Sequence, residues 1–201
     1  MGELIQVEAA GKRSHDPVAD GKPTLSRTPQ NAIPAESAIN IQDFAYMSAF
    51  TIRGLFISPG HNFFGHHGQE AGINPLHEVE EIECVAGHGV RGDRFFDFKQ
   101  DYKGQITFFS SEVFADICSL LGASPSSAGV TRRNVITEGA DLNTLIGKRF
   151  SLQGVEFEGT AQCAPCYWMN HAIAPGAEKA LQGRGGLRAR ILTDGKLRVD
   201  R

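Results

Sequence analysis

The stretch Arg149-Phe-Ser-Leu-Gln-Gly-Val-Glu-Phe-Glu-Gly159 contains two short strand-like runs, residues 149–152 and 155–159, on either side of the turn-forming pair Gln153-Gly154. Two such runs joined by two residues predict a β-hairpin, because a two-residue turn brings the strands side by side. A second turn signal, Asp194-Gly195, separates the runs 187–192 and 196–199 and is the stronger hairpin cue of the two. The C-terminal part of the chain is therefore expected to be β-structure.

The same kind of pattern extends toward the N-terminus. Further strand-like runs cover residues 49–57, 76–85, 105–109 and 133–137. A helix is expected from Ser110 or Ser111 to Leu121, since a serine can cap it and Gly122 can end it. Two shorter helices are expected at residues 167–171 and 177–181. Many short strands with few helices favour a mainly β fold, a β-barrel with a few short peripheral helices.

The chain of 201 residues suits a single domain with a tail. Residues 1–46 are polar and rich in proline and glycine, and such a segment buries too little apolar surface to offset its ordering entropy. We expect residues 1–46 to form a flexible N-terminal tail and residues 47–201 to form the domain. Met47 is a candidate translation start.

Charge and cysteine content narrow the function classes. Twenty Lys and Arg against 23 Asp and Glu give a net charge of −3, so nucleic acid is not an expected partner. We find no apolar run long enough to span a membrane and no signal peptide, so no membrane partner is expected. The spacing of the four cysteines does not suggest a disulfide framework, which favours a reducing, cytoplasmic location.

Two of the cysteines form the motif Cys163-Ala-Pro-Cys166, which allows several chemical interpretations. A thioredoxin-type redox pair belongs at a strand-to-helix turn early in a βαβ fold, and only 35 residues follow Cys166. A zinc site needs further ligands that the sequence does not place nearby. The remaining interpretations are a single exposed thiolate that binds a metal centre or carries sulfur, and two buried cysteines that act as small hydrophobic residues.

Glycines and arginines recur in three segments that are suited to binding an anion. Asp93 and Arg94 end a loop with three glycines, where they are candidate catalytic or anion-binding groups, or an ion pair that fixes the loop. Arg132-Arg133-Asn134 precedes an apolar run, and adjacent arginines on a strand point to opposite faces, so one of them can meet a phosphate. The third segment is a glycine-rich turn that leads to Arg188 and Arg190, and a plain turn into a strand is its simpler interpretation.

Three histidines, His61, His66 and His67, lie in another glycine-rich loop. Adjacent histidines usually diverge, so we expect these side chains to be solvated rather than to bind a metal.

Taken together and in order, these motifs resemble the MOSC domain, which is named for the C-terminal domain of molybdenum cofactor sulfurases. The resemblance covers roughly residues 48–200. The matching segments are Ile52-Arg-Gly-Leu-Phe-Ile-Ser58, Gly92-Asp-Arg94, Gln105-Ile-Thr-Phe-Phe, Arg133-Asn-Val-Ile-Thr, Asp141-Leu-Asn, Gly147-Lys-Arg-Phe150, Cys163-Ala-Pro-Cys166 and Arg188-Ala-Arg-Ile-Leu.

The resemblance implies a MOSC-type β-barrel that binds a molybdenum cofactor, a pterin (molybdopterin) with a terminal phosphate, in a basic groove. It implies that Cys166 either ligates molybdenum or carries sulfur, and we place Asp93 beside it as a second candidate catalytic residue. The candidate cofactor-binding residues are Ser58, Arg94, Arg132, Arg133, Asn134, Arg188 and Arg190. Some proteins of this family reduce amidoximes, and the loop after Ser58 departs from their sequence pattern, because it has His61 and Asn62 but no lysine. A domain with a pyridoxal lysine is absent from the sequence, so pyridoxal phosphate is not an expected cofactor.

Three functions follow from this resemblance. The first is an oxidoreductase that reduces N-hydroxylated small molecules at a Cys166-ligated molybdenum, with electrons from an external donor protein. The second is a carrier in which Cys166 holds a persulfide, or the protein holds the cofactor, for transfer to another protein. The third is a binding module without chemistry. Between the two cysteines, Cys166 is the expected ligand, because it stands where a strand leads into a short helix.

Overall fold

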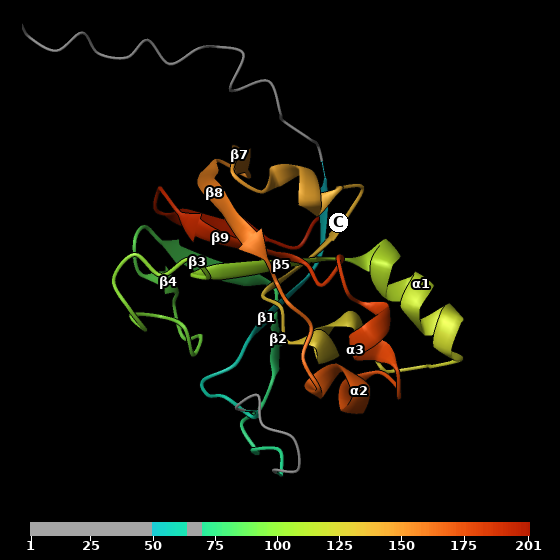
Figure 1. The fold of residues 1–201 in the computed structure, drawn as a ribbon. Helices are drawn as coiled ribbons and strands as arrows, with labels where there is room; N and C mark the ends of the chain where they lie inside the picture. The colour runs from blue at the N-terminus through green and yellow to red at the C-terminus, as the bar shows by residue number, and fades with distance from the viewer. Residues whose placement is uncertain (1–49, 64–69) are drawn as a thin grey trace, which may run out of the picture. The chain divides into compact units, whose positions relative to one another are not determined.

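Ten strands form two sheets in the part of the chain that the computed structural model describes, residues 50–63 and 70–201 (Figure 1). These residues belong to the unit formed by residues 39–201, and the predicted tail, residues 1–46, lies outside the described residues. The strands are β1 (Thr51–Ile57), β2 (His77–Val79), β3 (Glu81–Val85), β4 (Gly89–Val90), β5 (Ile106–Ser110), β6 (Val135–Glu138), β7 (Arg149–Leu152), β8 (Val155–Gln162), β9 (Leu187–Ile191) and β10 (Gly195–Arg198). The helices are α1 (Ser111–Leu121), α2 (Trp168–Ala172) and α3 (Ala177–Ala180), and the 3-10 helices are η2 (Ala128–Thr131) and η3 (Leu142–Leu145).

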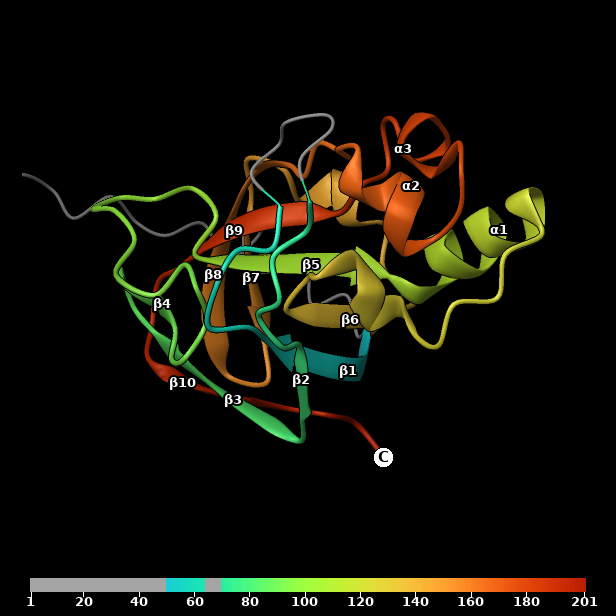
Figure 2. The same cartoon turned by 90° about the horizontal axis from the view of Figure 1, so that it is seen from below.

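The large sheet has the strand order β2-β1-β6-β5-β9-β8-β7, and the small sheet has the order β10-β3-β4 (Figure 2). All neighbours are antiparallel except β5 and β6. The mainly β prediction is confirmed, but the expected closed barrel is not found: both sheets are open among the described strands. The predicted run 76–85 divides at Glu80, and β2 pairs with β1 whereas β3 pairs with β10.

The two turn signals behave differently. Gln153 and Gly154 have φ values of 50° and 82°, as a type I′ turn requires, and they join β7 to β8 in the predicted hairpin. The prediction of a hairpin at Asp194-Gly195 is wrong. The strand before this turn, β9, pairs with β5 and β8, whereas the strand that begins at Gly195, β10, pairs with β3. The Asp194 carboxylate accepts a hydrogen bond of 2.7 Å from the Ala86 amide. This bond ties the segment between β9 and β10 to the end of β3, where the chain passes from the large sheet to the small sheet.

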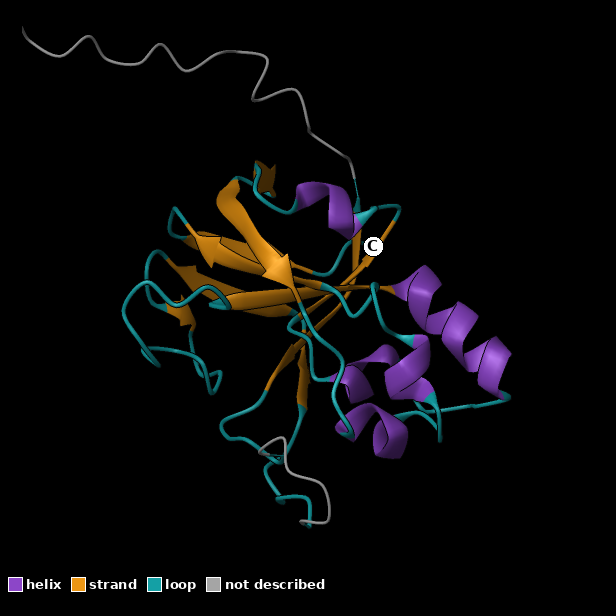
Figure 3. Ribbon diagram, viewed as in Figure 1, coloured by secondary structure: helices purple, strands orange, loops and turns teal. Residues whose placement is uncertain are grey.

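Two hydrophobic cores cover opposite faces of the large sheet. Consecutive residues of a strand point to opposite faces, and on β1 Leu55 joins the first core while Phe56 joins the second. The first core includes residues of both sheets, such as Phe108 of β5 and Leu197 of β10. The second core lies under α1, α2 and α3, which gather on one side of the large sheet (Figure 3).

The helix α1 forms as the sequence predicts. The Ser110 side chain accepts a hydrogen bond from the Val113 amide at its start, and Gly122, with φ of 62°, closes it in the left-handed conformation. Among residues 50–63 and 70–201, no helix is long and apolar enough to cross a lipid bilayer.

Candidate functional site

The end of β1 and the loop after β4 meet at one place, and Asp93 holds them together. Its side chain is 1% exposed, and its carboxylate accepts hydrogen bonds from the amides of Ser58 at 3.2 Å and Phe95 at 3.1 Å. The Arg94 guanidinium lies 3.2 Å from the same carboxylate, and the Arg94 amide donates to the Ser58 carbonyl at 2.8 Å. A carboxylate bound on several sides in this way positions its neighbours, so Asp93 supports this candidate site, and its catalytic role stays a prediction.

Three guanidinium groups surround this support. Arg94 Nη2 donates to the carbonyl of Arg132 at 3.1 Å, and Arg132 Nη2 donates to Ser58 Oγ at 2.5 Å and to the Gly60 carbonyl at 2.7 Å. Arg133 Nε donates to the Gly185 carbonyl at 3.3 Å. We call Arg94, Arg132 and Arg133 the arginine cluster.

The predicted strand geometry of the two adjacent arginines is wrong. Arg132 ends η2 in the left-handed conformation, with φ of 56°, and β6 begins only at Val135. The turn at Arg132 therefore directs the guanidinium toward Ser58 and the end of β1, instead of leaving the two arginines on opposite faces of a strand.

The arginine cluster carries more positive charge than its surroundings neutralise. Burial lowers the pKa of Arg94, Asp93 offsets part of this effect, and Arg133 adds to it by repulsion. Burial also lowers the pKa of Arg132, and the charge of Arg94 lowers it further. Three guanidiniums near a single buried carboxylate leave an excess of positive charge, which favours binding of an anion.

Asn134 supports the arginine cluster from within the sheet. It is 2% exposed, and its side-chain oxygen accepts hydrogen bonds from the amide and the hydroxyl of Thr107 at 3.0 and 2.9 Å. Its side-chain nitrogen donates to the Phe56 carbonyl at 3.2 Å. The side chain thus links β1, β5 and β6 directly beside Arg133, which gives it a structural role.

The cysteine motif connects β8 to α2 and borders the arginine cluster. Cys163 is 1% exposed, and its amide donates to the Gly186 carbonyl at 2.7 Å. A Cβ atom on Gly185 would lie 2.1 Å from the Cys163 carbonyl oxygen, so only glycine fits beside this loop. The carbonyl of the same Gly185 accepts the hydrogen bond from Arg133, which connects the loop to the cluster.

Cys166 is the accessible thiol of the motif. All four cysteines are free, and Cys166 is half-buried whereas Cys163 is buried. Burial raises the pKa of Cys84 to about 12, and burial also raises the pKa of Cys118. Cys166 stands between β8 and α2, as expected, and its carbonyl accepts a hydrogen bond from the Met169 amide at 2.9 Å.

Two alternative interpretations of the motif find no support. Both sheet neighbours of β8 are antiparallel to it, so the motif does not lie in the βαβ unit of a thioredoxin-type pair. Within the described ranges 50–63 and 70–201, no group of three or more His, Cys, Asp and Glu side chains could hold a metal ion. A metal at Cys166 would therefore need ligands that do not come from this part of the chain.

Aromatic side chains flank the arginine cluster, and the sequence analysis missed them. The Arg94 guanidinium lies 4.9 Å from the ring centre of Phe95, and the ring of Tyr102 stacks on Phe95 at 5.3 Å. The centres of the His61 and Phe95 rings lie 4.9 Å apart in a T-shaped arrangement, and His61 is half-buried rather than solvated as expected. His66 and His67 lie outside the described residues. The ring of Phe63 lies 6.0 Å from that of Tyr167, the residue after Cys166.

The two arginines of β9 differ in their surroundings. Both lie on the face opposite the buried Leu187, Ala189 and Ile191. Arg190 pairs with Glu158 at 2.9 Å, whereas a Cβ atom on Gly104 would touch both the Tyr102 ring and the Arg188 side chain. The structure therefore brings Arg188 close to the aromatic side chains next to the cluster and gives Arg190 a partner on β8.

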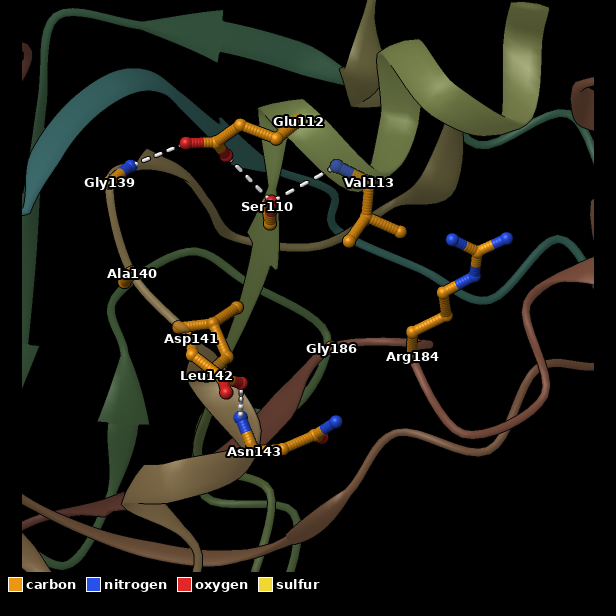
Figure 4. Close-up of a pocket in the computed structure, with 10 residues that line it drawn as sticks. All are labelled: Ser110, Glu112, Val113, Gly139, Ala140, Asp141, Leu142, Asn143, Arg184 and Gly186. Atoms are coloured by element: carbon orange, nitrogen blue, oxygen red, sulfur yellow. Dashed lines mark hydrogen bonds between the residues drawn. The ribbon is translucent and has the colours of Figure 1, made fainter. Parts of the chain in front are cut away.

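A cavity of about 370 Å³ is lined by Gly139, the residue after β6, whereas the arginine cluster includes residues that precede β6. Figure 4 shows the residues that line the cavity. Its polar groups bind one another: the Glu112 carboxylate accepts the Gly139 amide at 2.6 Å and the Ser110 hydroxyl at 2.7 Å. Burial alone would raise the pKa of Glu112, but these hydrogen bonds lower it overall. None of the predicted site residues lines this cavity; its lining is Ser110, Glu112, Val113, Gly139, Ala140, Asp141, Leu142, Asn143, Arg184 and Gly186.

Comparison with known proteins agrees with this architecture. The YuaD protein from Bacillus subtilis has a similar fold, with a TM-score of 0.57 and 17% identity over 75% of this chain and 92% of that chain. YiiM from Geobacillus stearothermophilus gives a TM-score of 0.53 and 16% identity over 74% of this chain and 71% of its own. No protein of the curated set matches the chain. The family model described as MOSC domain matches residues 66–201, and the chain therefore belongs to the MOSC domain family.

Proposed function

We propose that this protein binds a molybdenum cofactor, with its phosphate on the arginine cluster and its metal at Cys166. The observation that carries the proposal is the excess of positive charge at Arg94, Arg132 and Arg133 next to the cysteine loop. Arg133 donates to the carbonyl of Gly185, and the carbonyl of the next residue, Gly186, accepts the Cys163 amide. Membership of the MOSC domain family, which is associated with this cofactor, supports the same assignment.

The residues present fit such a group. A cofactor that brings its own metal ligands needs one soft ligand from the protein. Cys166 is a half-buried cysteine, and no set of metal-ligating side chains surrounds it in residues 50–63 and 70–201. A terminal phosphate needs charged donors, and arginine guanidiniums bind phosphate through paired hydrogen bonds. Asp93 and Asn134 keep the backbone that carries these donors in place.

The proposed activity is the reduction of N-hydroxylated small molecules. The net reaction takes an N–OH compound, two electrons and two protons to the corresponding N–H compound and water. When bound, the cofactor supplies a two-electron redox centre for this reaction. The chain's own residues hold the phosphate, present the thiolate of Cys166 and line the site with aromatic rings, while an external electron-donor protein supplies the electrons.

A sulfur carrier is the second candidate, and one observation favours it. Cys166 is the half-buried thiol of the motif while Cys163 is buried, and a persulfide carrier needs one accessible thiolate. In this case Cys166 exchanges sulfur with a donor or acceptor protein. Either function suits a reducing compartment such as the cytoplasm, where thiols stay reduced.

The test is an activity assay on protein produced in a host that makes the cofactor. With reduced viologen as electron donor, the wild-type protein should convert an N-hydroxylated base to the amine. Cys166→Ser should abolish turnover, because serine is a hard and weakly acidic ligand, and the matched control Cys163→Ser should retain it. Turnover by Cys166→Ser, or no turnover by fully loaded wild-type protein, would contradict the proposed activity.

A further inference from the structure

His61 lies at the edge of the arginine cluster and belongs to the same surface. Arg132 Nη2 donates to the carbonyl of Gly60, the residue before His61, at 2.7 Å. The centres of the His61 and Phe95 rings lie 4.9 Å apart in a T-shaped arrangement, and the Arg94 guanidinium lies 4.9 Å from the centre of the Phe95 ring. His61 thus shares the Phe95 ring with Arg94 and follows the residue that Arg132 binds, and both arginines act on it electrostatically.

The loop that carries His61 is held in place on its other side. The Asn62 and Asn74 side chains bind across the loop: Asn62 Nδ2 donates to the Asn74 carbonyl, and the Asn74 amide donates to Asn62 Oδ1, at 2.9 and 2.8 Å. Asn74 Nδ2 also donates to the His61 carbonyl at 2.9 Å. These bonds fix the backbone at His61, from which the imidazole extends to the Phe95 ring.

Charged and titratable groups of the described residues reach the surroundings of His61 from three segments: Asp93 and Arg94 after β4, Arg132 at the end of η2, and Tyr102, which stacks on Phe95. Burial lowers the pKa of His61, and Arg94 and then Arg132 lower it further, whereas Asp93 acts in the opposite direction. The positive charge of the cluster thus opposes protonation of the imidazole as long as no anion compensates it.

We propose that His61 takes up a proton when a divalent anion binds to the arginine cluster and then serves as an additional cationic ligand of that anion. The inference rests on the anion site of the proposed function and extends it. A dianion offsets the repulsion that Arg94 and Arg132 exert on a protonated imidazole, so binding and protonation favour each other. By the reciprocity of linked equilibria, acidification must then tighten anion binding by the same factor.

Sulfate is the suitable probe, because it remains a dianion between pH 5.5 and 8 and does not itself titrate there. The measurement is the Kd for sodium sulfate by calorimetry as a function of pH, at an ionic strength kept constant with sodium chloride. We expect the Kd of wild-type protein to be about five- to tenfold lower at pH 5.5 than at pH 8. In parallel, NMR titration of the imidazole protons should show a higher pKa of His61 in sulfate than in chloride.

Two variants separate the proposal from the proposed function. His61→Gln should bind sulfate at pH 8 about as tightly as wild type but should lose the tightening at low pH. The control His77→Gln, a change at an exposed histidine on β2, should keep it. If wild-type protein binds sulfate with no pH dependence, or if His61→Gln keeps that dependence, the proposal is wrong while the anion site stands. If wild-type protein does not bind sulfate at any pH, both the proposal and the anion site of the proposed function are overturned.

Discussion

Replacement of Asp93 by asparagine should destabilise the domain strongly, although the two side chains have nearly the same shape. The carboxylate is 1% exposed and accepts two backbone amides and the Arg94 guanidinium. An asparagine keeps one acceptor oxygen, so its amide nitrogen must face an N–H donor, and Arg94 loses its counter-charge. Breaking a buried ion pair by removing one partner costs about 3–5 kcal/mol, and we take the lower end, about 3 kcal/mol, because the isosteric side chain keeps part of its hydrogen bonding.

The assay is thermal and denaturant unfolding of Asp93→Asn beside a matched control, Asp97→Asn. A loss of about 3 kcal/mol corresponds to a Tm lower by about 6–12 °C for a domain of this size. Asp97 is 59% exposed and pairs with His88 at the surface, so its replacement should change the free energy of unfolding by less than about 0.5 kcal/mol. Equal stability of the two variants would refute the role of Asp93 as the support of the site.

Three further predictions concern the cysteines and the arginine cluster. At pH 8 a maleimide should label Cys166 well before Cys84, because Cys84 is buried and its pKa is raised to about 12; equal labelling rates, read by mass spectrometry, would contradict this order. Gly185→Ala should lower the free energy of unfolding by about 2–3 kcal/mol, since its Cβ atom would lie 2.1 Å from the Cys163 carbonyl oxygen, and wild-type stability in a urea titration would show that the loop yields without cost. Arg132→Gln should weaken sulfate binding at pH 8 about tenfold by calorimetry, and an unchanged Kd would remove this residue from the anion site.

Local sequence signals were sufficient for most elements of this fold. The serine cap and the terminating glycine define α1, and positive φ at Gln153 and Gly154 produces the β7–β8 hairpin. What the local signals do not contain is the choice of strand partner. The turn at Asp194-Gly195 carries the chain from one sheet to the other, because the pairing of β10 with β3 depends on contacts more than a hundred residues apart in the sequence.

The candidate site, too, was predictable from the sequence only in part. Motif order, through the family resemblance, selected Ser58, Asp93, Arg94 and Arg132, and the structure connects all four by hydrogen bonds. The expectation of a solvated His61 is wrong, because its packing against Phe95 depends on the fold of a loop and not on spacing in the sequence.

The most direct test of the account is the molybdenum and pterin content of the purified wild-type protein and of the two cysteine variants, all produced in a cofactor-making host. We predict about one molybdenum and one pterin per wild-type chain, nearly the same content in Cys163→Ser, and a severe loss of molybdenum in Cys166→Ser. A trappable persulfide on Cys166 without metal would assign the protein to sulfur transfer instead. Wild-type protein with neither molybdenum nor a persulfide, or Cys166→Ser with full metal content, would contradict the central claim that Cys166 and the arginine cluster together hold the cofactor.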